Sequence, residues 1–241
     1  MNHRILFAAL TISVLSACTD ATGQKDPVVL RNNIDSVSYG LGTDIGNNLR
    51  MQLQGELLDT LNTAALTEGI RDALDSTERM TADNVRELVQ AFMLDAQKRM
   101  LAKEENEAAE NLRKGQEFLA ENGQRPEVKT TESGLQYEVL QAGKGTAPGA
   151  TDRVTVNYRG TLLDGTEFDS SYKRGEPAQF GVDQVIAGWT EGLQLMRTGS
   201  RYKFYIPAEL AYGKSRGPGG SLPLNSTLVF EVELLGVTPS N

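Results

Sequence analysis

The segment QVIAGWTEGLQLM, residues 184–196, contains the only tryptophan of the chain, Trp189. Apolar residues lie on both sides of Trp189 at helical spacing, and two glycines are interleaved with them. This pattern predicts a short amphipathic helix with one buried face. Trp189 could be an ordinary core residue that closes this helix onto a sheet, or it could form the floor of a ligand pocket.

The sequence after about residue 135 is typical of short β-strands. RVTVNYRGTL (153–162) and YKFYI (202–206) alternate apolar with polar residues, TLVFEVELLGV (227–237) is a further apolar run, and LDGTEF (163–168) has the composition of a turn. The simplest assembly of these parts is an antiparallel sheet wrapped around the helix that contains Trp189.

The sequence before about residue 126 predicts helices instead. One apolar residue recurs at every fourth position, in Val37, Leu41, Ile45, Leu49 and Leu53. Glycines lie beside this stripe and weaken an isolated helix, so Gly40, Gly42 and Gly46 indicate that another backbone approaches closely.

A second helix is predicted over TAALTEGIRDAL (63–74), whose Ala65, Ile70 and Leu74 could cover the first helix. Helices this short bury little surface alone, and a partner chain is the natural way to cover them. The sequence therefore favours a homodimer.

A long helix is predicted to begin after Thr81, which is a suitable N-cap, because residues 82–114 contain neither proline nor glycine. If it continues to about Asn122, its roughly forty residues span about 60 Å. The segment KEENEAAENLRKGQ (103–116) is polar nearly all round, which is typical of a helix that bridges domains through solvent. A charged coiled coil is the alternative, but no sustained heptad seam supports it.

The N-terminal segment MNHRILFAALTISVLSAC predicts a signal peptide, because its apolar run after Arg4 is too short to span a bilayer. Small residues before Cys18 resemble the lipobox of bacterial lipoproteins, in which that cysteine is acylated. We expect residues 1–17 to be a lipoprotein signal peptide and residues 18–33 to be a flexible tether. The alternative is an ordinary signal peptide with an incidental Cys18. Thr19 in place of aspartate favours the outer membrane of a diderm bacterium.

Composition excludes several kinds of chemistry. His3 is the only histidine and Cys18 the only cysteine, so a processed and acylated chain would have neither a histidine nor a free thiol. This excludes nucleophiles activated by histidine, intrachain disulfides and zinc sites with nitrogen and sulfur ligands. We expect no metal and no cofactor. A net charge of -8 disfavours nucleic acid as a partner.

Four stretches resemble the FKBP-type peptidyl-prolyl isomerases in order and with short gaps: VNYRGTLLDGTEFDSSY (156–172), PAQFGVDQVIAGWTEGLQLM (177–196), YIPAELAYG (205–213) and LVFEVELL (228–235). Three earlier stretches resemble the macrophage-infectivity-potentiator group of that family: SYGLGTDIGNNL (38–49), LTEGIRDAL (66–74) and residues 118–145. The resemblance implies an α+β fold. Its expected parts are a helical dimerisation domain (34–80), a long connecting helix (81–125) and an FKBP-like antiparallel half-barrel wrapped on a short helix (126–241).

The resemblance also implies the residues of the active site. Three are expected to act on the substrate: the backbone N–H of Ile186 and the hydroxyl of Tyr212 would bond substrate carbonyls, and Asp169 would orient the pocket edge and act electrostatically on the twisting bond. Asp169 could instead form a salt bridge or cap a turn. The remaining expected pocket residues are Tyr158, Phe168, Phe180, Val185, Trp189 and Phe230, with Trp189 as the floor.

Two departures from the family pattern concern substrate preference. Ala178 follows Pro177 where compact single-domain relatives carry an aromatic residue, and the loop GKSRGPGGSLPLN (213–225) lacks the histidine that some relatives have. Both leave the expected floor of the pocket unchanged.

The resulting functional hypothesis is a lipid-anchored isomerase of the bacterial cell envelope, at the outer membrane and facing the periplasm, that twists Xaa-Pro amides of folding envelope proteins. A second hypothesis is a holdase that binds unfolded proteins, irrespective of proline, in the cleft of a V-shaped dimer. A third is an anchored adhesion or scaffold protein whose pocket is no longer used.

Overall fold

The computed structural model describes residues 28–53 and 60–240. The expected signal peptide, Cys18 and most of the expected tether lie outside these residues. The chain divides into two compact units, Met1–Arg79 and Met80–Asn241. Within the part of the chain that is described, no helix combines the length and the apolar character needed to cross a membrane.

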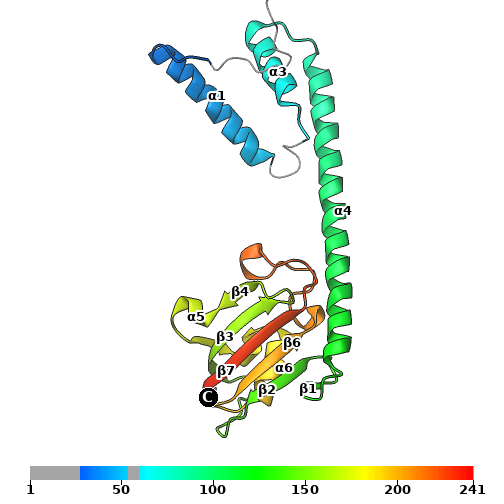
Figure 1. The fold of residues 1–241 in the computed structure, drawn as a ribbon, viewed down its shortest axis with the longest axis vertical. Coiled ribbons are helices and arrows are strands. Elements are labelled where there is room, and N and C mark those ends of the chain that lie inside the picture. The colour runs from blue at the N-terminus through cyan, green and yellow to red at the C-terminus, as the bar shows by residue number, and fades with distance from the viewer. Residues whose placement is uncertain (1–27, 54–59, 241) are drawn as a thin grey trace, which may run out of the picture. The chain divides into compact units, whose positions relative to one another are not determined.

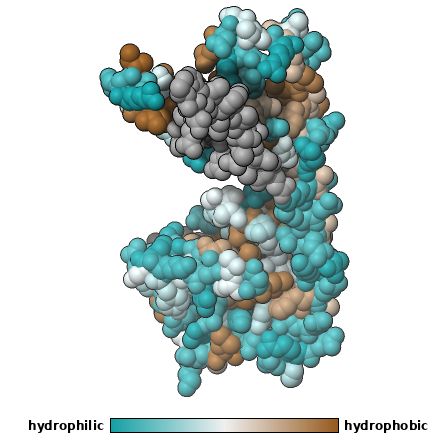
Figure 2. Space-filling model, turned by 45° about the horizontal axis from the view of Figure 1, so that its top comes forward, coloured by the Kyte–Doolittle hydropathy of each residue, from teal (hydrophilic) through white to brown (hydrophobic). Residues whose placement is uncertain are grey.

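The described part of the first unit includes helices α1 (Asn33–Gln52) and α3 (Thr63–Asp75), which confirms both helix predictions (Figure 1). Asn32 and Asn62 cap their N-termini with side-chain oxygens. The first part of the apolar stripe of α1 is exposed, Leu41 to 63%, whereas Leu53 at its end is buried. Leu74 of α3 is 81% exposed, so α3 does not cover α1 in the way the sequence suggested. Hydrophobic residues are accordingly visible on the outside of this unit (Figure 2).

The long helix α4 covers Ala82–Asn122, and Thr81 accepts a hydrogen bond from the backbone N–H of Asn84 at 3.3 Å, as predicted. The expectation that residues 103–116 bridge domains through solvent is wrong for one face of this helix. Ala108 and Gly115 are buried, and a Cβ atom at Gly115 would lie 2.2 Å from Oγ1 of Thr227, in the same unit. Hydropathy does not predict this contact, because it is made by small side chains and by side-chain amides and not by large apolar residues.

A seven-stranded antiparallel sheet forms the body of the second unit, in the order β1-β2-β6-β7-β3-β4 with β5 also paired to β3. The strands are β1 (Val128–Thr130), β2 (Gln136–Gln141), β3 (Arg153–Leu162), β4 (Glu167–Ser170), β5 (Ala178–Gly181), β6 (Arg201–Ile206) and β7 (Leu228–Thr238). The strands predicted from residues 153–162, 202–206 and 227–237 match β3, β6 and β7. The short helix α5 (Ser171–Arg174) follows β4.

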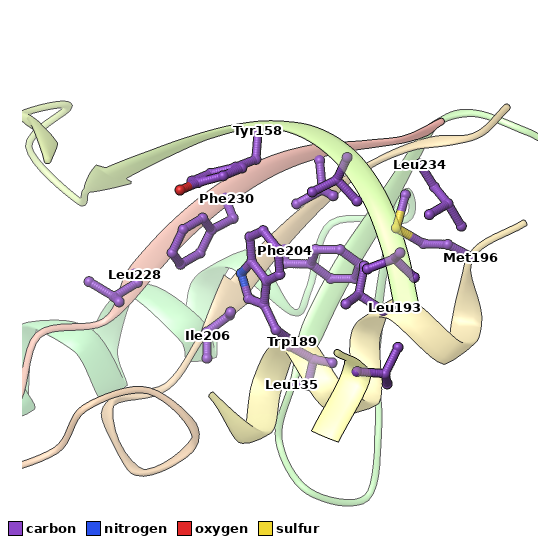
Figure 3. Packing of buried hydrophobic residues seen from close by; sticks show 14 residues of the cluster. Leu135, Tyr158, Trp189, Leu193, Met196, Phe204, Ile206, Leu228, Phe230 and Leu234 are labelled. Carbon is purple, nitrogen blue, oxygen red and sulfur yellow. The ribbon is translucent and has the colours of Figure 1, made fainter. Parts of the chain in front are cut away.

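Helix α6 (Ala187–Leu195) packs against the sheet and places Trp189 in the hydrophobic core (Figure 3). The two glycines of the 184–196 segment permit this close packing. A Cβ atom at Gly188 would lie 2.5 Å from a methyl carbon of Ile206, and one at Gly192 would lie 2.7 Å from the ring of Phe204. The helix can therefore lie close to β6, with Trp189 beside Phe230 of β7.

Candidate active site

A cavity of about 420 Å³ opens beside α6 and is lined by all nine residues that the family resemblance placed in one pocket. They come from β3, β4, β5, β7, α6 and the segments before α6 and after β6. Its lining is Tyr158, Phe168, Asp169, Phe180, Val185, Ile186, Trp189, Tyr212 and Phe230, together with Gln184 and Pro218. Gln184 and Pro218 were not among the expected pocket residues.

Trp189 is at the centre of the aromatic residues. Its ring meets those of Tyr158, Phe180 and Phe230 nearly edge to face, with centroid distances of 5.2, 5.6 and 5.2 Å. It is only 4% exposed and belongs to the hydrophobic core, yet it also lines the cavity. Core packing and the pocket surface therefore use the same residue, and the two interpretations of Trp189 are compatible.

A polar network borders the cavity. The hydroxyl of Tyr158 donates to Oδ2 of Asp169 at 2.5 Å. Arg174 donates from Nη1 to Oδ1 of Asp169 and from Nη2 to the hydroxyl of Tyr158, each at 2.6 Å. Asp169 therefore forms the salt bridge that was its alternative role, while it also lines the cavity.

Sequence reasoning missed Arg174, which fixes both of these polar side chains. Its guanidinium also lies 5.3 Å from the ring centre of Tyr158, as a cation-π contact. The available signal was its spacing: Arg174 follows Asp169 by one short helix, and Gly175, at φ +79°, ends that helix and turns the chain. A basic residue at this position can fold back onto the carboxylate.

Two tyrosine hydroxyls at the cavity remain protonated at neutral pH. Burial, assisted by the hydrogen bond to Asp169, raises the pKa of Tyr158 to about 12. Burial and the nearby charge of Asp169 also raise the pKa of Tyr212. The hydroxyl of Tyr212 forms no hydrogen bond with a described residue, and the same holds for the backbone N–H of Ile186, at the N-cap of α6. Both can donate to a ligand.

No group of three or more His, Cys, Asp or Glu residues within 28–53 and 60–240 has the proximity to hold a metal ion. The polar groups of the lining residues are one carboxylate, two phenols, an amide side chain, the indole N–H of Trp189 and backbone groups. Such a set can bind carbonyl groups and enclose an apolar ring, but it provides no histidine base and no free thiol nucleophile.

Two family descriptions match the chain: "FKBP-type peptidyl-prolyl cis-trans isomerase" over residues 144–235, and the domain amino-terminal to it over residues 34–139. The FKBP-type isomerase FkpA of Escherichia coli K12 is 41% identical over 237 residues, which cover 98% of this chain and 87% of that protein. This chain is an FKBP-type peptidyl-prolyl cis-trans isomerase.

The isomerase is also 40% identical to "Outer membrane protein MIP" of Legionella longbeachae, over 98% of both chains. The crystal structure of FkpA from Escherichia coli matches with a TM-score of 0.77 and 43% identity, and the match covers 88% of this chain and 100% of that one. These relatives place the isomerase in the macrophage-infectivity-potentiator-like group. They also confirm the α+β fold of a helical N-terminal part, a long helix and an FKBP domain.

Proposed function

We propose that this isomerase accelerates the folding of cell-envelope proteins by twisting Xaa-Pro amides in the cavity above Trp189. The observation that supports the site most directly is the convergence of six aromatic rings on one cavity, with Asp169 at its edge and two donors that have no partner among the described residues. A proline ring fits an apolar wall of this kind, and the free donors suit the carbonyls on either side of it.

The reaction suits a site without a nucleophile. Rotation about the Xaa-Pro bond breaks no covalent bond but must overcome a resonance barrier of about 18 to 20 kcal/mol. The planar amide has more charge separation than the twisted one, so an apolar site that removes water stabilises the twisted form relative to the planar form. Catalysis then consists of complementarity to the transition state, through packing and desolvation.

The polar groups would fix the substrate in the cavity. The backbone N–H of Ile186 and the hydroxyl of Tyr212 would each donate to a substrate carbonyl. Asp169 would act through its charge and through the position of Tyr158, since the salt bridge to Arg174 holds its carboxylate at the cavity edge. Asp169 transfers no proton in this scheme.

The cell-envelope location is supported by the N-terminal sequence and by a relative. Residues 1–17 have the pattern of a lipoprotein signal peptide that ends before Cys18, and the Legionella longbeachae relative is named an outer membrane protein. We propose that acylated Cys18 anchors the protein to the outer membrane, facing the periplasm, with residues 18–33 as the tether.

Lipidation at Cys18 is tested by mass spectrometry of the protein expressed in a diderm bacterium. We expect a mature chain that begins at Cys18 and carries acyl mass, in the membrane fraction. Cys18→Ser should lose the acyl mass and the membrane association. A mature N-terminus at any other residue, or an unmodified Cys18, would contradict the proposed anchor.

Dimerisation is supported by the uncovered N-terminal part of the apolar stripe of α1. Ile34, Val37, Leu41 and Ile45 are more than half exposed, and nothing within the described chain approaches the Cβ positions of Gly40, Gly42 and Gly46 within 4 Å. We propose that a second copy covers this stripe within the helical domain, residues 34–80, because water-exposed apolar stripes of this length favour association.

The same exposed residues support the second candidate, a holdase that binds unfolded proteins independently of proline. One experiment distinguishes the two functions. It compares the double variant Asp169→Ala with Tyr212→Phe, called the pocket variant, with a chain that lacks residues 19–80. Refolding limited by an Xaa-Pro bond and light scattering of an aggregating client without proline are measured side by side.

We expect the pocket variant to lose most of its acceleration of proline-limited refolding, because that step needs the cavity. The deletion should retain acceleration of a short Xaa-Pro peptide. If the pocket variant still accelerates proline-limited refolding as the natural chain does, the isomerase proposal for this cavity fails. If aggregation is suppressed by the natural chain and by the pocket variant but not by the deletion, the helical domain is a holdase.

A further inference from the structure

One loop at the edge of the cavity depends on contacts with α4. This rim loop, Gly213–Asn225, follows Tyr212 directly and contributes Pro218 to the cavity lining. The loop also supports Tyr212, since a Cβ atom at Gly217 would lie 3.3 Å from the tyrosine ring and 2.7 Å from Leu222, which is buried. The position of the rim loop therefore determines the position of two cavity residues.

The rim loop has little regular structure of its own. Four of its glycines, Gly213, Gly217, Gly219 and Gly220, have positive φ, and Asn225 has φ +55°. Its base is closed by the backbone hydrogen bond from the N–H of Asn225 to the carbonyl of Gly213 at 2.7 Å. Inside the loop, the N–H of Leu222 donates to the carbonyl of Arg216 and that of Gly220 to the carbonyl of Gly217, each at 3.1 Å. These short-range bonds leave much of the glycine-rich backbone unconstrained, so contacts from outside the loop help to hold it in one conformation.

Helix α4 provides these contacts along a single face. Nδ2 of Asn111 donates to the carbonyl of Leu224 at 3.0 Å, and Nδ2 of Asn225 donates to the carbonyl of Ala108 at 3.3 Å. Arg216 also pairs with Glu104 at 2.6 Å, although that pair is exposed and contributes little. The helix positions are Glu104, Ala108 and Asn111, with Gly115 against Thr227 one turn further. Spacings of three and four residues place them on one stripe.

The remainder of α4 fixes the helix to the sheet. Phe118 packs on Tyr205 with a centroid distance of 5.7 Å, Gln136 donates to the carbonyl of Leu119 at 2.8 Å, and Asn122 donates to Gln136 at 2.8 Å. The helix is therefore held by β2 and β6 at its C-terminal end and contacts the rim loop about two turns earlier (Figure 1).

We propose that Asn111 of α4 and Asn225 are positioning residues for the isomerase reaction. The hydrogen bonds that their side-chain amides donate between α4 and the rim loop hold this loop, and the loop in turn places Tyr212 and Pro218 at the cavity. This inference rests on the proposed role of the cavity. Neither asparagine lines the cavity, so each acts only through the loop. The connecting helix is then part of the machinery that shapes the substrate site.

The test uses the full chain with Asn111→Ala and Asn225→Gly combined. Glycine at 225 accepts the positive φ without strain, and Asn111→Ala alone, which leaves the loop sequence unchanged, separates the loss of the hydrogen bonds from the added backbone freedom of glycine. The matched control is Asn106→Ala, on an exposed face of α4 where the structure shows no hydrogen bond for that side chain. Amide hydrogen exchange and peptide kinetics are measured on all three variants.

We expect amide exchange within residues 213–225 to accelerate about 10-fold in the double variant, with exchange in β3, β6 and β7 unchanged. We expect kcat/KM for a Leu-Pro peptide to fall about 3- to 10-fold, mainly through a higher KM, because the mobile loop no longer presents Tyr212 in place. Asn106→Ala should match the natural chain in both measurements.

Unchanged exchange in the rim loop would overturn the anchoring, whatever the kinetics show. Faster loop exchange with unchanged kcat/KM would overturn the positioning role. Tyr212→Phe is measured alongside the double variant. If kcat/KM is unchanged in Tyr212→Phe as well, the proposed role of the cavity is wrong, and the failure does not concern the loop alone. Gly115→Ala provides an independent route, since its methyl group would meet Thr227, and it should reproduce the faster loop exchange.

Discussion

Asp169→Ala combined with Tyr212→Phe is expected to lower kcat/KM for a Leu-Pro peptide about 10- to 100-fold while the fold is retained. Tyr212→Phe removes a hydroxyl donor, and Asp169→Ala removes the partner of Tyr158 and Arg174. Such bonds contribute about 1 kcal/mol when neutral and about 1.5 to 3 kcal/mol when charged. A loss of 1.4 kcal/mol from transition-state binding is about tenfold in rate. Magnetisation-exchange NMR on the peptide measures the effect directly.

The matched control is Asp95→Ala combined with Tyr172→Phe, the same two changes at exposed positions outside the cavity. It should leave exchange unchanged. Fast exchange in the natural chain that persists in the cavity variant would show an isomerase whose polar residues are elsewhere. No acceleration by the natural chain would contradict the assigned enzyme activity and favour the holdase.

The pH profile provides a further check on the same assignment. The pKa of Tyr158 is raised to about 12 and that of Tyr212 is also raised, so neither hydroxyl loses its proton near neutrality. The chain's only histidine, His3, lies in the expected signal peptide. We expect kcat/KM of the natural chain to be constant between about pH 6 and about pH 9. A midpoint inside this window would indicate a titrating group that the proposed mechanism lacks.

The sequence predicted those parts of the structure whose physics is local. Thr81 followed by a long stretch free of proline and glycine predicted α4, and strict alternation predicted β3, because capping and side-chain period act within a few residues. The nine residues of the cavity were assembled only through the family resemblance. No period or spacing brings Tyr158, Trp189 and Tyr212 together, since their proximity depends on the sheet topology.

The features that sequence reasoning missed involve contacts between segments that are far apart in the chain. Asn111 contacts Leu224, and Gly115 contacts Thr227, through an amide and through the absence of a side chain. Asparagine and glycine both have a low hydropathy, so hydropathy does not mark them as buried. It therefore predicts a solvent-exposed helix for the polar segment 103–116. Arg174 was missed for a similar reason, because charge alone predicts a surface position and gives no partner.

Gly160→Ala is expected to destabilise the FKBP domain by about 2 kcal/mol and to reduce kcat/KM severely, because this glycine makes room for two walls of the cavity. Gly160 of β3 pairs with Phe230 of β7 and with Asp169 of β4. A Cβ atom there would lie 2.7 Å from the ring of Phe230 and 2.8 Å from that of Phe168. Both rings must move, and Phe230 also contacts Trp189, so the displacement reaches the floor.

Gly236→Ala is the matched control, because Gly236 lies in β7 with ordinary φ and its Cβ would meet only Thr155, at 4.0 Å. Replacing a strand glycine that has room for a methyl group should lower the free energy of unfolding by no more than about 0.5 kcal/mol, and it can raise that free energy. Urea unfolding followed by the fluorescence of Trp189, the only tryptophan, reports both variants. Equal stability and equal kcat/KM for the two variants would show that Phe168 and Phe230 adjust without cost, and that the shape of the cavity does not depend on the absence of a side chain at residue 160.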